Sequence, residues 1–260
     1  MFTGPSCAAL LLATLGACQA EPPERAPPGD FADKWTGGVI SSSGQGDGDE
    51  TGEGGATGDV QGTVKRFVGT DFASTEPYDE PAEIWIMDRQ LGKEIAKVPY
   101  DGAEFSVQRH ADPQWLAVVP EFDLEHLDSL TLWDGQAEPR PAMLARSALE
   151  EIMGGLIAAD FPNDARAQLF VRIVEKDGTT GVAGVIPTVV GGPNLAFLDG
   201  GAWRDVDDST GDSGEFLAYN VSAAALPGQD VKVMLSGSLD AEFTVRLATG
   251  ATTMVTYIEP

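Results

Sequence analysis

The 260-residue sequence contains only two cysteines and two histidines. Cys7 and Cys18 both lie near the N-terminus, so the rest of the chain contains neither a disulfide framework nor a cysteine-rich metal site. His110 and His126 are too few and too isolated to suggest a histidine-based zinc site. We therefore expect no cofactor, apart from the calcium alternative weighed below.

Basic residues are also scarce, with 16 Lys and Arg against 41 Asp and Glu, which gives a net charge of −25. Such a surface repels phosphate backbones, so nucleic acid is excluded as a partner. The hydrophobic fraction of 42% is sufficient to form the hydrophobic cores of folded domains. The length suits one or two ordinary domains.

Long apolar runs are missing as well. The apolar stretch from Cys7 to Ala17 is too short for a transmembrane helix, which needs roughly 20 residues. Its length is typical of the central region of a signal peptide, and the prolines that follow it stop a helix from continuing. We interpret residues 1–17 as a signal peptide.

The end of this stretch, Leu15-Gly16-Ala17-Cys18, resembles the lipobox of bacterial lipoproteins. The resemblance implies cleavage before Cys18 and acylation of its thiol, which anchors the protein in a membrane. Gln19, in place of the aspartate that signals inner-membrane retention, favours the outer membrane of the cell envelope. The first six residues lack the Lys or Arg of a usual signal peptide, so an ordinary secretory signal with an incidental cysteine stays open.

The remainder of the chain divides by composition. Residues 18–57 are acidic and rich in Pro, Gly and Ser, which predicts a disordered, flexible stalk. After it we expect a β-sandwich unit over 58–138, a connecting helix within 139–163 and a second β-sandwich unit over 164–260.

Both expected units show strand patterns separated by turn residues about every ten positions. In 82–88, Ile84 and Ile86 share one face and Trp85 the other, whereas 114–122 is a nearly continuous apolar run that predicts a buried strand. The fold class is therefore mainly β, with two antiparallel prealbumin-like or immunoglobulin-like sandwiches.

Between the units, apolar residues recur at the spacing of one helix face. We expect an amphipathic helix that packs on a sheet or bridges the units with Leu149, Ile152, Met153, Leu156 and Ile157.

The segments VQGTV and DGAEF in the first unit, and GVAGV and DSGEF in the second, resemble carboxypeptidase-regulatory-like domains, which are transthyretin-like sandwiches. Ala103 stands where that family has glycine, so the second unit matches better. The resemblance implies a noncatalytic module of a surface or secreted protein, related to carbohydrate-binding-like folds.

Two motifs suggest chemistry. Gly211-Asp212-Ser213-Gly214 copies the letters around a protease nucleophile, but neither histidine lies in a matching motif, so we interpret it as a turn. A cluster of carboxylates suggests a weak calcium site or, alternatively, a solvated acidic loop. Its members are Asp205, Asp207, Asp208 and Asp212.

No set of side chains suited to acid–base or nucleophilic catalysis can be assembled, so we expect no enzyme. The leading hypothesis is a noncatalytic, lipid-anchored envelope protein that serves as a structural or interaction module for a protein or polymer partner. The alternative is a carbohydrate-binding surface lipoprotein that stacks a polysaccharide on exposed aromatic rings. Trp203 and Trp133, in turn-rich segments, are the candidate ligand-binding residues.

Overall fold

The computed structural model describes residues 38–41 (backbone only), 58–70, 72, 74–90, 92–135, 137–157 and 162–260. The predicted signal peptide, the predicted acylation site Cys18 and most of the predicted stalk lie outside these residues. Gly38–Ser41, within the predicted stalk, form a strand, β1.

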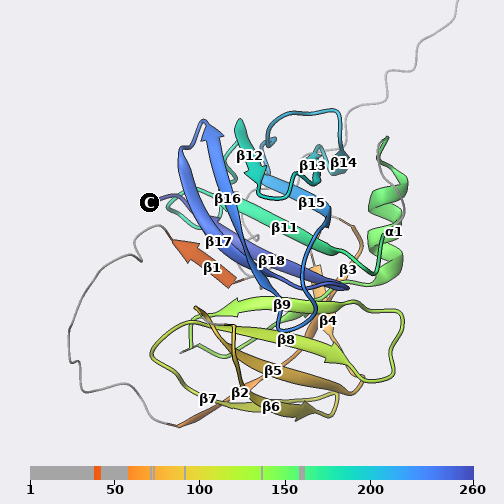
Figure 1. Ribbon diagram of the computed structural model, residues 1–260, viewed down its shortest axis with the longest axis vertical. Helices are drawn as coiled ribbons and strands as arrows, with labels where there is room; N and C mark the ends of the chain where they lie inside the picture. Colours follow the sequence, from red (N-terminus) through yellow and green to blue (C-terminus); the bar gives the residue numbers. More distant parts are fainter. Residues whose placement is uncertain are drawn as a thin grey trace, which may run out of the picture.

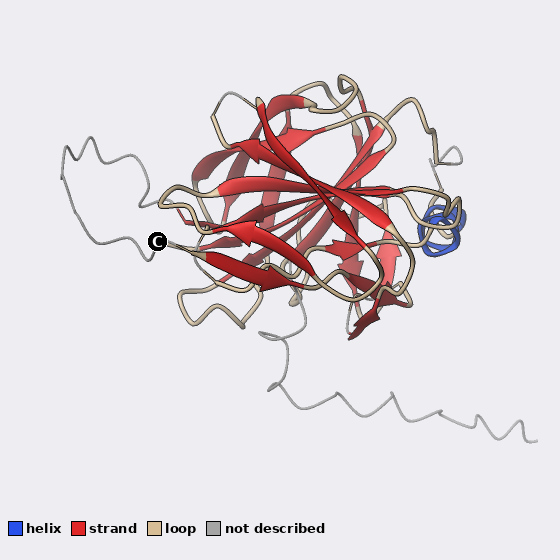
Figure 2. Ribbon diagram, turned by 90° about the horizontal axis from the view of Figure 1, so that it is seen from below, coloured by secondary structure: helices blue, strands red, loops and turns tan. Residues whose placement is uncertain are grey.

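The described residues otherwise form a mainly β, sandwich-like structure, as predicted (Figures 1 and 2). Its further elements are β2 (Asp59–Gly62), β3 (Lys65–Val68), β4 (Ser74–Pro77), β5 (Ala82–Asp88), β6 (Glu94–Tyr100), β7 (Phe105–Gln108), β8 (Gln114–Pro120), β9 (Asp128–Trp133), β10 (Ala142–Met143), α1 (Arg146–Gly154), β11 (Ala167–Val174), β12 (Val185–Val189), β13 (Asn194–Asp199), β14 (Ala202–Arg204), β15 (Glu215–Val221), β16 (Gln229–Gly237), β17 (Ala241–Leu247) and β18 (Ala251–Ile258).

A ten-stranded sheet runs through the whole molecule in the order β14-β13-β15-β11-β18-β9-β8-β5-β6, with β1 added beside β18. The strands on one side of β18 come from the predicted first unit and those on the other side from the second. β18 is parallel to β9, β11 and β1, whereas the other pairs in this sheet are antiparallel. The two predicted units therefore share one sheet, a continuity that the sequence patterns did not indicate.

Smaller layers cover both faces of this sheet. The three-stranded sheet β12-β16-β17 packs on one face around Val171, Phe216 and Val233. α1 and β3 cover the opposite face of the C-terminal half, where Phe170 and Leu217 are buried. The two-stranded β2-β7 sheet closes one face of the N-terminal half around Ile84 and Phe105, which are nearly inaccessible to solvent.

The strand patterns explain these layers. Every residue of β11 is buried, because β11 lies in the middle of the sheet with packing on both faces. In β5, Ile84 and Ile86 are buried while Trp85 is half-buried, which confirms the predicted alternation.

The predicted helix is present but short. Leu149, Ile152 and Met153 are buried against the sheet, as expected for one amphipathic face. Ile157 is 82% exposed, contrary to the expectation, because α1 ends at Gly154 and the helical spacing no longer applies beyond it. In the part of the chain that the structure describes, no helix has the length and apolarity to cross a bilayer.

Candidate interaction surface

The two candidate sugar-stacking tryptophans are buried, so neither has the exposed ring that the carbohydrate-binding alternative requires. Trp203 is 8% exposed, and its Nε1 donates a hydrogen bond to the carbonyl oxygen of Thr70 at 2.8 Å. Its ring packs edge-on against Phe72 and Phe170. These contacts come from a segment more than a hundred residues away in the sequence, which turn residues beside Trp203 do not reveal.

Trp133 is likewise only 5% exposed. It ends β9, and its Nε1 donates to the carbonyl oxygen of Ala137 at 2.7 Å. Neither ring offers a free face to a sugar, and both occupy the core role common for buried indoles with a satisfied N–H group.

The four aspartates of the predicted calcium loop do not converge. Asp205 Oδ1 accepts a hydrogen bond from the backbone N–H of Ile157 at 3.0 Å, so it joins the end of the helical segment to this loop. Asp208 and Asp212 are exposed, and Asp207 is partly exposed. Within the described ranges, no three acidic, His or Cys side chains are grouped so that they could hold a metal ion.

The protease-like motif is a turn, as predicted. The backbone N–H of Gly214 donates to the carbonyl oxygen of Gly211 at 3.0 Å. Ser213 Oγ donates to the carbonyl oxygen of Leu198 at 2.9 Å. The hydroxyl that the motif would use as a nucleophile thus ties the turn to β13.

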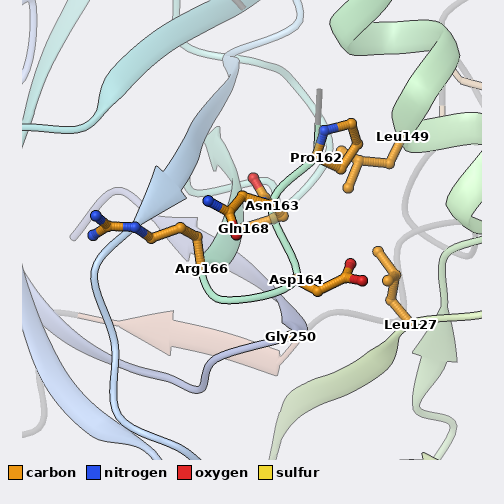
Figure 3. Close-up of a pocket in the computed structure, with 8 residues that line it drawn as sticks. All are labelled: Leu127, Leu149, Pro162, Asn163, Asp164, Arg166, Gln168 and Gly250. Carbon is orange, nitrogen blue, oxygen red and sulfur yellow. The ribbon is translucent and has the colours of Figure 1, made fainter. Parts of the chain in front are cut away.

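A hollow lies beside the start of α1, between Leu127, Leu149 and the segment that precedes β11 (Figure 3). Asp164 lies toward Leu127, while the Arg166 side chain extends away from the hollow. The space that it encloses is about 10 Å³, room for no more than about one water molecule.

The most unusual surface feature is the segment Glu121–His126 between β8 and β9, which we call the 121–126 loop. Phe122 is 86% exposed and Leu124 is 87% exposed. The buried strand predicted over 114–122 ends at Pro120, so its expected extension to Phe122 is wrong. Among the described residues, Phe122 and Leu124 are the two most exposed large apolar side chains, and they lie two positions apart on one loop.

Contacts on both sides hold this loop in place. The backbone N–H of Glu121 donates to the carbonyl oxygen of Pro81 at 3.3 Å, and that of Arg146 donates to the carbonyl oxygen of Glu125 at 2.6 Å. His126 forms an isolated antiparallel bridge with Ala145, just before α1. The loop is thus fixed to Pro81, just before β5, and to the start of the helix.

The residue between the two exposed side chains points inward. Asp123 Oδ2 accepts a hydrogen bond from Tyr78 Oη at 3.1 Å and lies 2.5 Å from His126 Nδ1. Asp123 Oδ1 accepts from the backbone N–H of Glu125 at 2.7 Å. Tyr78 and His126 also pack edge to face. These contacts make a polar anchor beneath an apolar tip.

Burial and the hydrogen bonds of this polar anchor shift the pKa values of Asp123 and Tyr78. Burial alone would raise the pKa of Asp123, but the hydrogen bonds from Glu125, His126 and Tyr78 together outweigh it and hold the pKa below its ordinary value. Burial, and then the neighbouring Asp123 carboxylate, raise the pKa of Tyr78. At neutral pH an ionised Asp123 therefore accepts hydrogen bonds from a neutral Tyr78.

The sequence contains a signal for this loop that strand patterns obscure. In Glu-Phe-Asp-Leu-Glu, residues 121–125, acidic and apolar residues alternate just after Pro120. Period-two alternation is typical of a half-buried strand, so this pattern predicts that the apolar positions belong to the core. Pro120 ends β8, and it is the residue that distinguishes an exposed loop after the strand from a buried strand that continues to Phe122.

Comparisons with known proteins leave the family open. No protein-family model matches the chain, and no curated protein matches it. Among solved structures, an ancillary pilin of Streptococcus is 11% identical over 77% of this chain and 68% of its own, with a TM-score of 0.26. The shaft pilin SpaA of Lactobacillus rhamnosus GG is 10% identical over 77% and 97%, with a TM-score of 0.25. The pilus backbone protein RrgB of Streptococcus pneumoniae is 10% identical over 74% and 58%, with a TM-score of 0.22. These scores are too low to establish a common fold.

Proposed function

We propose that this chain is a noncatalytic, lipid-anchored protein of the cell envelope that binds a protein partner through the 121–126 loop. The exposure of Phe122 and Leu124 on an anchored loop is the observation that supports this proposal. The lipid anchor rests on the lipobox-like residues that end at Cys18.

Exposed apolar side chains favour binding when they are already held in place. The contacts of Asp123 with Tyr78 and His126 fix the loop backbone between Phe122 and Leu124. A partner that buries both side chains removes apolar surface from water without first having to order the loop. Central apolar anchors of this kind supply much of the free energy in protein interfaces.

The surroundings of the tip define the chemistry of the partner. Glu121 and Glu125 are exposed on either side of Phe122 and Leu124, and the whole chain carries a net charge of −25. A complementary surface has an apolar pocket for the two side chains and Lys or Arg residues around it. An anionic polymer or membrane surface is disfavoured by the same charges.

The loop is tested by placing a photo-crosslinking residue at position 122 in the full chain in its native cells. We expect a discrete crosslinked protein that is lost when Leu124→Ser is added, because one apolar anchor is removed. The matched control is position 157, where an equally exposed Ile157 lies outside the loop. Equal crosslinking from positions 122 and 157, or a product insensitive to Leu124→Ser, contradicts the proposal.

The lipid anchor proposed at Cys18 is tested separately, by fractionating cells that express the Cys18→Ala chain. We expect this chain to leave the membrane fraction, because the acylated thiol is missing, while the unaltered chain remains there and incorporates labelled palmitate. A Cys18→Ala chain that stays in the membrane fraction contradicts the lipid anchor without affecting the proposal for the loop.

A further inference from the structure

Three loops lie together at one end of the N-terminal half of the sheet. Ala82, the first residue of β5, is the register partner of Tyr100, which ends β6, and of Pro120, which ends β8. Because β5 is antiparallel to both neighbours, the chain before β5, the turn after β6 and the 121–126 loop after β8 all lie at this end. Phe122 and Leu124, the apolar tip of the 121–126 loop, therefore have two other loops as neighbours.

Direct contacts hold the three loops against one another. Tyr100 Oη donates a hydrogen bond to the carbonyl oxygen of Tyr78, and Tyr78 Oη donates to Asp123 of the 121–126 loop. Gly102 has a φ of 94°, and a Cβ atom at this position would collide with the carbonyl oxygen of Asp79. The three loops thus form one surface, and a single partner can contact all of them.

Exposed carboxylates occur on all three loops. We call them the acidic collar, and they are Asp79, Glu80, Asp101, Glu104, Glu121 and Glu125. Segments 78–81, 101–104 and 121–126 contain no Lys or Arg. Within the ranges that the structure describes, no carboxylate of the collar forms an ion pair. Arg146, whose backbone bonds to Glu125, directs its guanidinium to Asp164 at 2.5 Å instead.

The negative charge of the collar acts on the buried hydroxyls at the base of the loops. Burial raises the pKa of Tyr100, and the carboxylates of Asp101 and Asp79 raise it further. Glu80 adds to the effects of burial and of Asp123 that raise the pKa of Tyr78. Carboxylates on separate loops thus contribute to one negative field, which attracts positive charge to this end of the molecule.

We infer that the acidic collar and the apolar tip form one binding surface, whose partner is a protein that presents Lys and Arg residues around a pocket for Phe122 and Leu124. The inference rests on the proposed function of the 121–126 loop and assigns a role to the two loops beside it. Complementary charges around an interface mainly speed association, whereas central apolar anchors slow dissociation. The collar therefore recruits the partner, and the tip retains it.

Two variants of equal net charge test the collar. In the collar variant, four carboxylates on the two neighbouring loops become amides, through Asp79→Asn, Glu80→Gln, Asp101→Asn and Glu104→Gln. In the control variant, four exposed carboxylates outside the collar become amides, through Asp112→Asn, Glu175→Gln, Asp208→Asn and Asp240→Asn. The probe is a labelled peptide of alternating Lys and Leu residues. Its association with the full chain and its dissociation are followed by stopped-flow fluorescence at low and high salt.

The two parts of the surface are expected to respond differently to salt. At about 50 mM salt, we expect the collar variant to bind the peptide about tenfold more weakly than the control variant, mainly through slower association. Most of this difference should disappear at about 500 mM salt, because salt screens exposed charges. Leu124→Ser is expected to speed dissociation at both salt concentrations. Equal affinities of the collar and control variants at low salt, or unchanged dissociation from Leu124→Ser, overturn the inference.

Crosslinking from position 122 in native cells separates this inference from the proposed function. We expect the crosslinked product to fall severalfold in the collar variant and to stay unchanged in the control variant. A product that depends on Leu124 but forms equally well on both variants overturns the role of the collar and leaves the proposed function intact. A chain without a specific product from position 122 contradicts the proposed function itself.

Discussion

The two halves of the central sheet meet at β18 but differ in what covers them. On the C-terminal side, β11 is buried along its whole length between the β12-β16-β17 sheet and the layer that contains α1. On the N-terminal side, β5 is buried on one face, whereas Trp85 on its other face is half-buried beneath Lys97. The comparison shows that one continuous sheet can be a double-covered core at one end and a half-solvated surface at the other.

The largest effect is expected in the double-covered half. Phe170 is fully buried and packs against Phe72 and Trp203, with ring centroids 4.8 Å and 5.8 Å away. Phe170→Ala is expected to lower the free energy of unfolding by about 3–5 kcal/mol, measured by urea denaturation. Trp85→Ala, in the half-solvated part, is the comparison and is expected to cost clearly less. Equal losses would mean that the two halves are equally well packed.

The next largest effect on the free energy of unfolding is expected at Asp128, a titratable residue close to the junction of the two halves. Burial raises the pKa of Asp128, at the start of β9, to about 6. The folded state therefore holds its proton to higher pH than the unfolded state, whose pKa is about 4. Stability falls as pH rises from about 4 through 6, because ionisation is penalised only in the folded state.

Asp128→Asn removes this penalty. We expect it to raise the free energy of unfolding at pH 7 by on the order of 2 kcal/mol, and by almost nothing at pH 4, where Asp128 is protonated in the folded state. Urea denaturation of both proteins at the two pH values measures the difference. A gain of the same size at pH 4 would exclude the ionisation of Asp128 as its cause.

Two buried tyrosine hydroxyls, one in the N-terminal half and one on β18, permit a matched comparison. Tyr78 Oη donates to Asp123, so Tyr78→Phe is expected to cost about 1–2 kcal/mol in the N-terminal half. Tyr257 is fully buried on Phe243, and among the described residues its hydroxyl has no hydrogen-bond partner. Tyr257→Phe is therefore expected to be neutral or slightly stabilising. Thermal unfolding of both variants distinguishes them, and a larger loss for Tyr257→Phe would contradict the contrast.

The smallest effect on stability is expected for Lys97, which lies over Trp85 on the half-solvated face of the sheet. Lys97 Nζ lies 3.5 Å from the centroid of the Trp85 ring and 3.4 Å from Glu83 Oε2. Lys97→Met is expected to cost about 0.5–1 kcal/mol, with part of the loss disappearing at high salt. Lys176→Met, on the exposed turn after β11, is the control for removing one positive charge. If Lys97→Met and Lys176→Met lower the free energy of unfolding equally, the contact of Lys97 with the Trp85 ring contributes nothing to stability.

Local patterns account for the strands better than for their partners. The alternation in 82–88 correctly placed Ile84 and Ile86 on one face of β5 and Trp85 on the other, because successive side chains of a strand point to opposite faces. The parallel pairing of β18 with β9 joins residues more than a hundred positions apart. No turn or spacing connects them, so two separate units were expected where one shared sheet exists.

Long-range contacts also limited the prediction of which candidate site residues are exposed. Trp203 lies beside Gly200 and Gly201, which suggest an exposed turn, but its burial depends on Thr70 and Phe72 from a distant segment. Conversely, Phe122 continues an apolar run and was assigned to the core, although the chain leaves the sheet after Pro120. Residue type and neighbours do not determine exposure when a long-range contact decides it.

The position of β18 has a consequence for how this protein is made. β18 occupies residues 251–258, yet it lies between the two halves of the sheet. Until the ribosome has passed residue 258, β9 and β11 lack their common neighbour and the halves have nothing to join them. Contacts between distant residues form slowly, so final assembly of the sheet comes after β18 has left the ribosome. The central sheet thus stays open until β18 has been made.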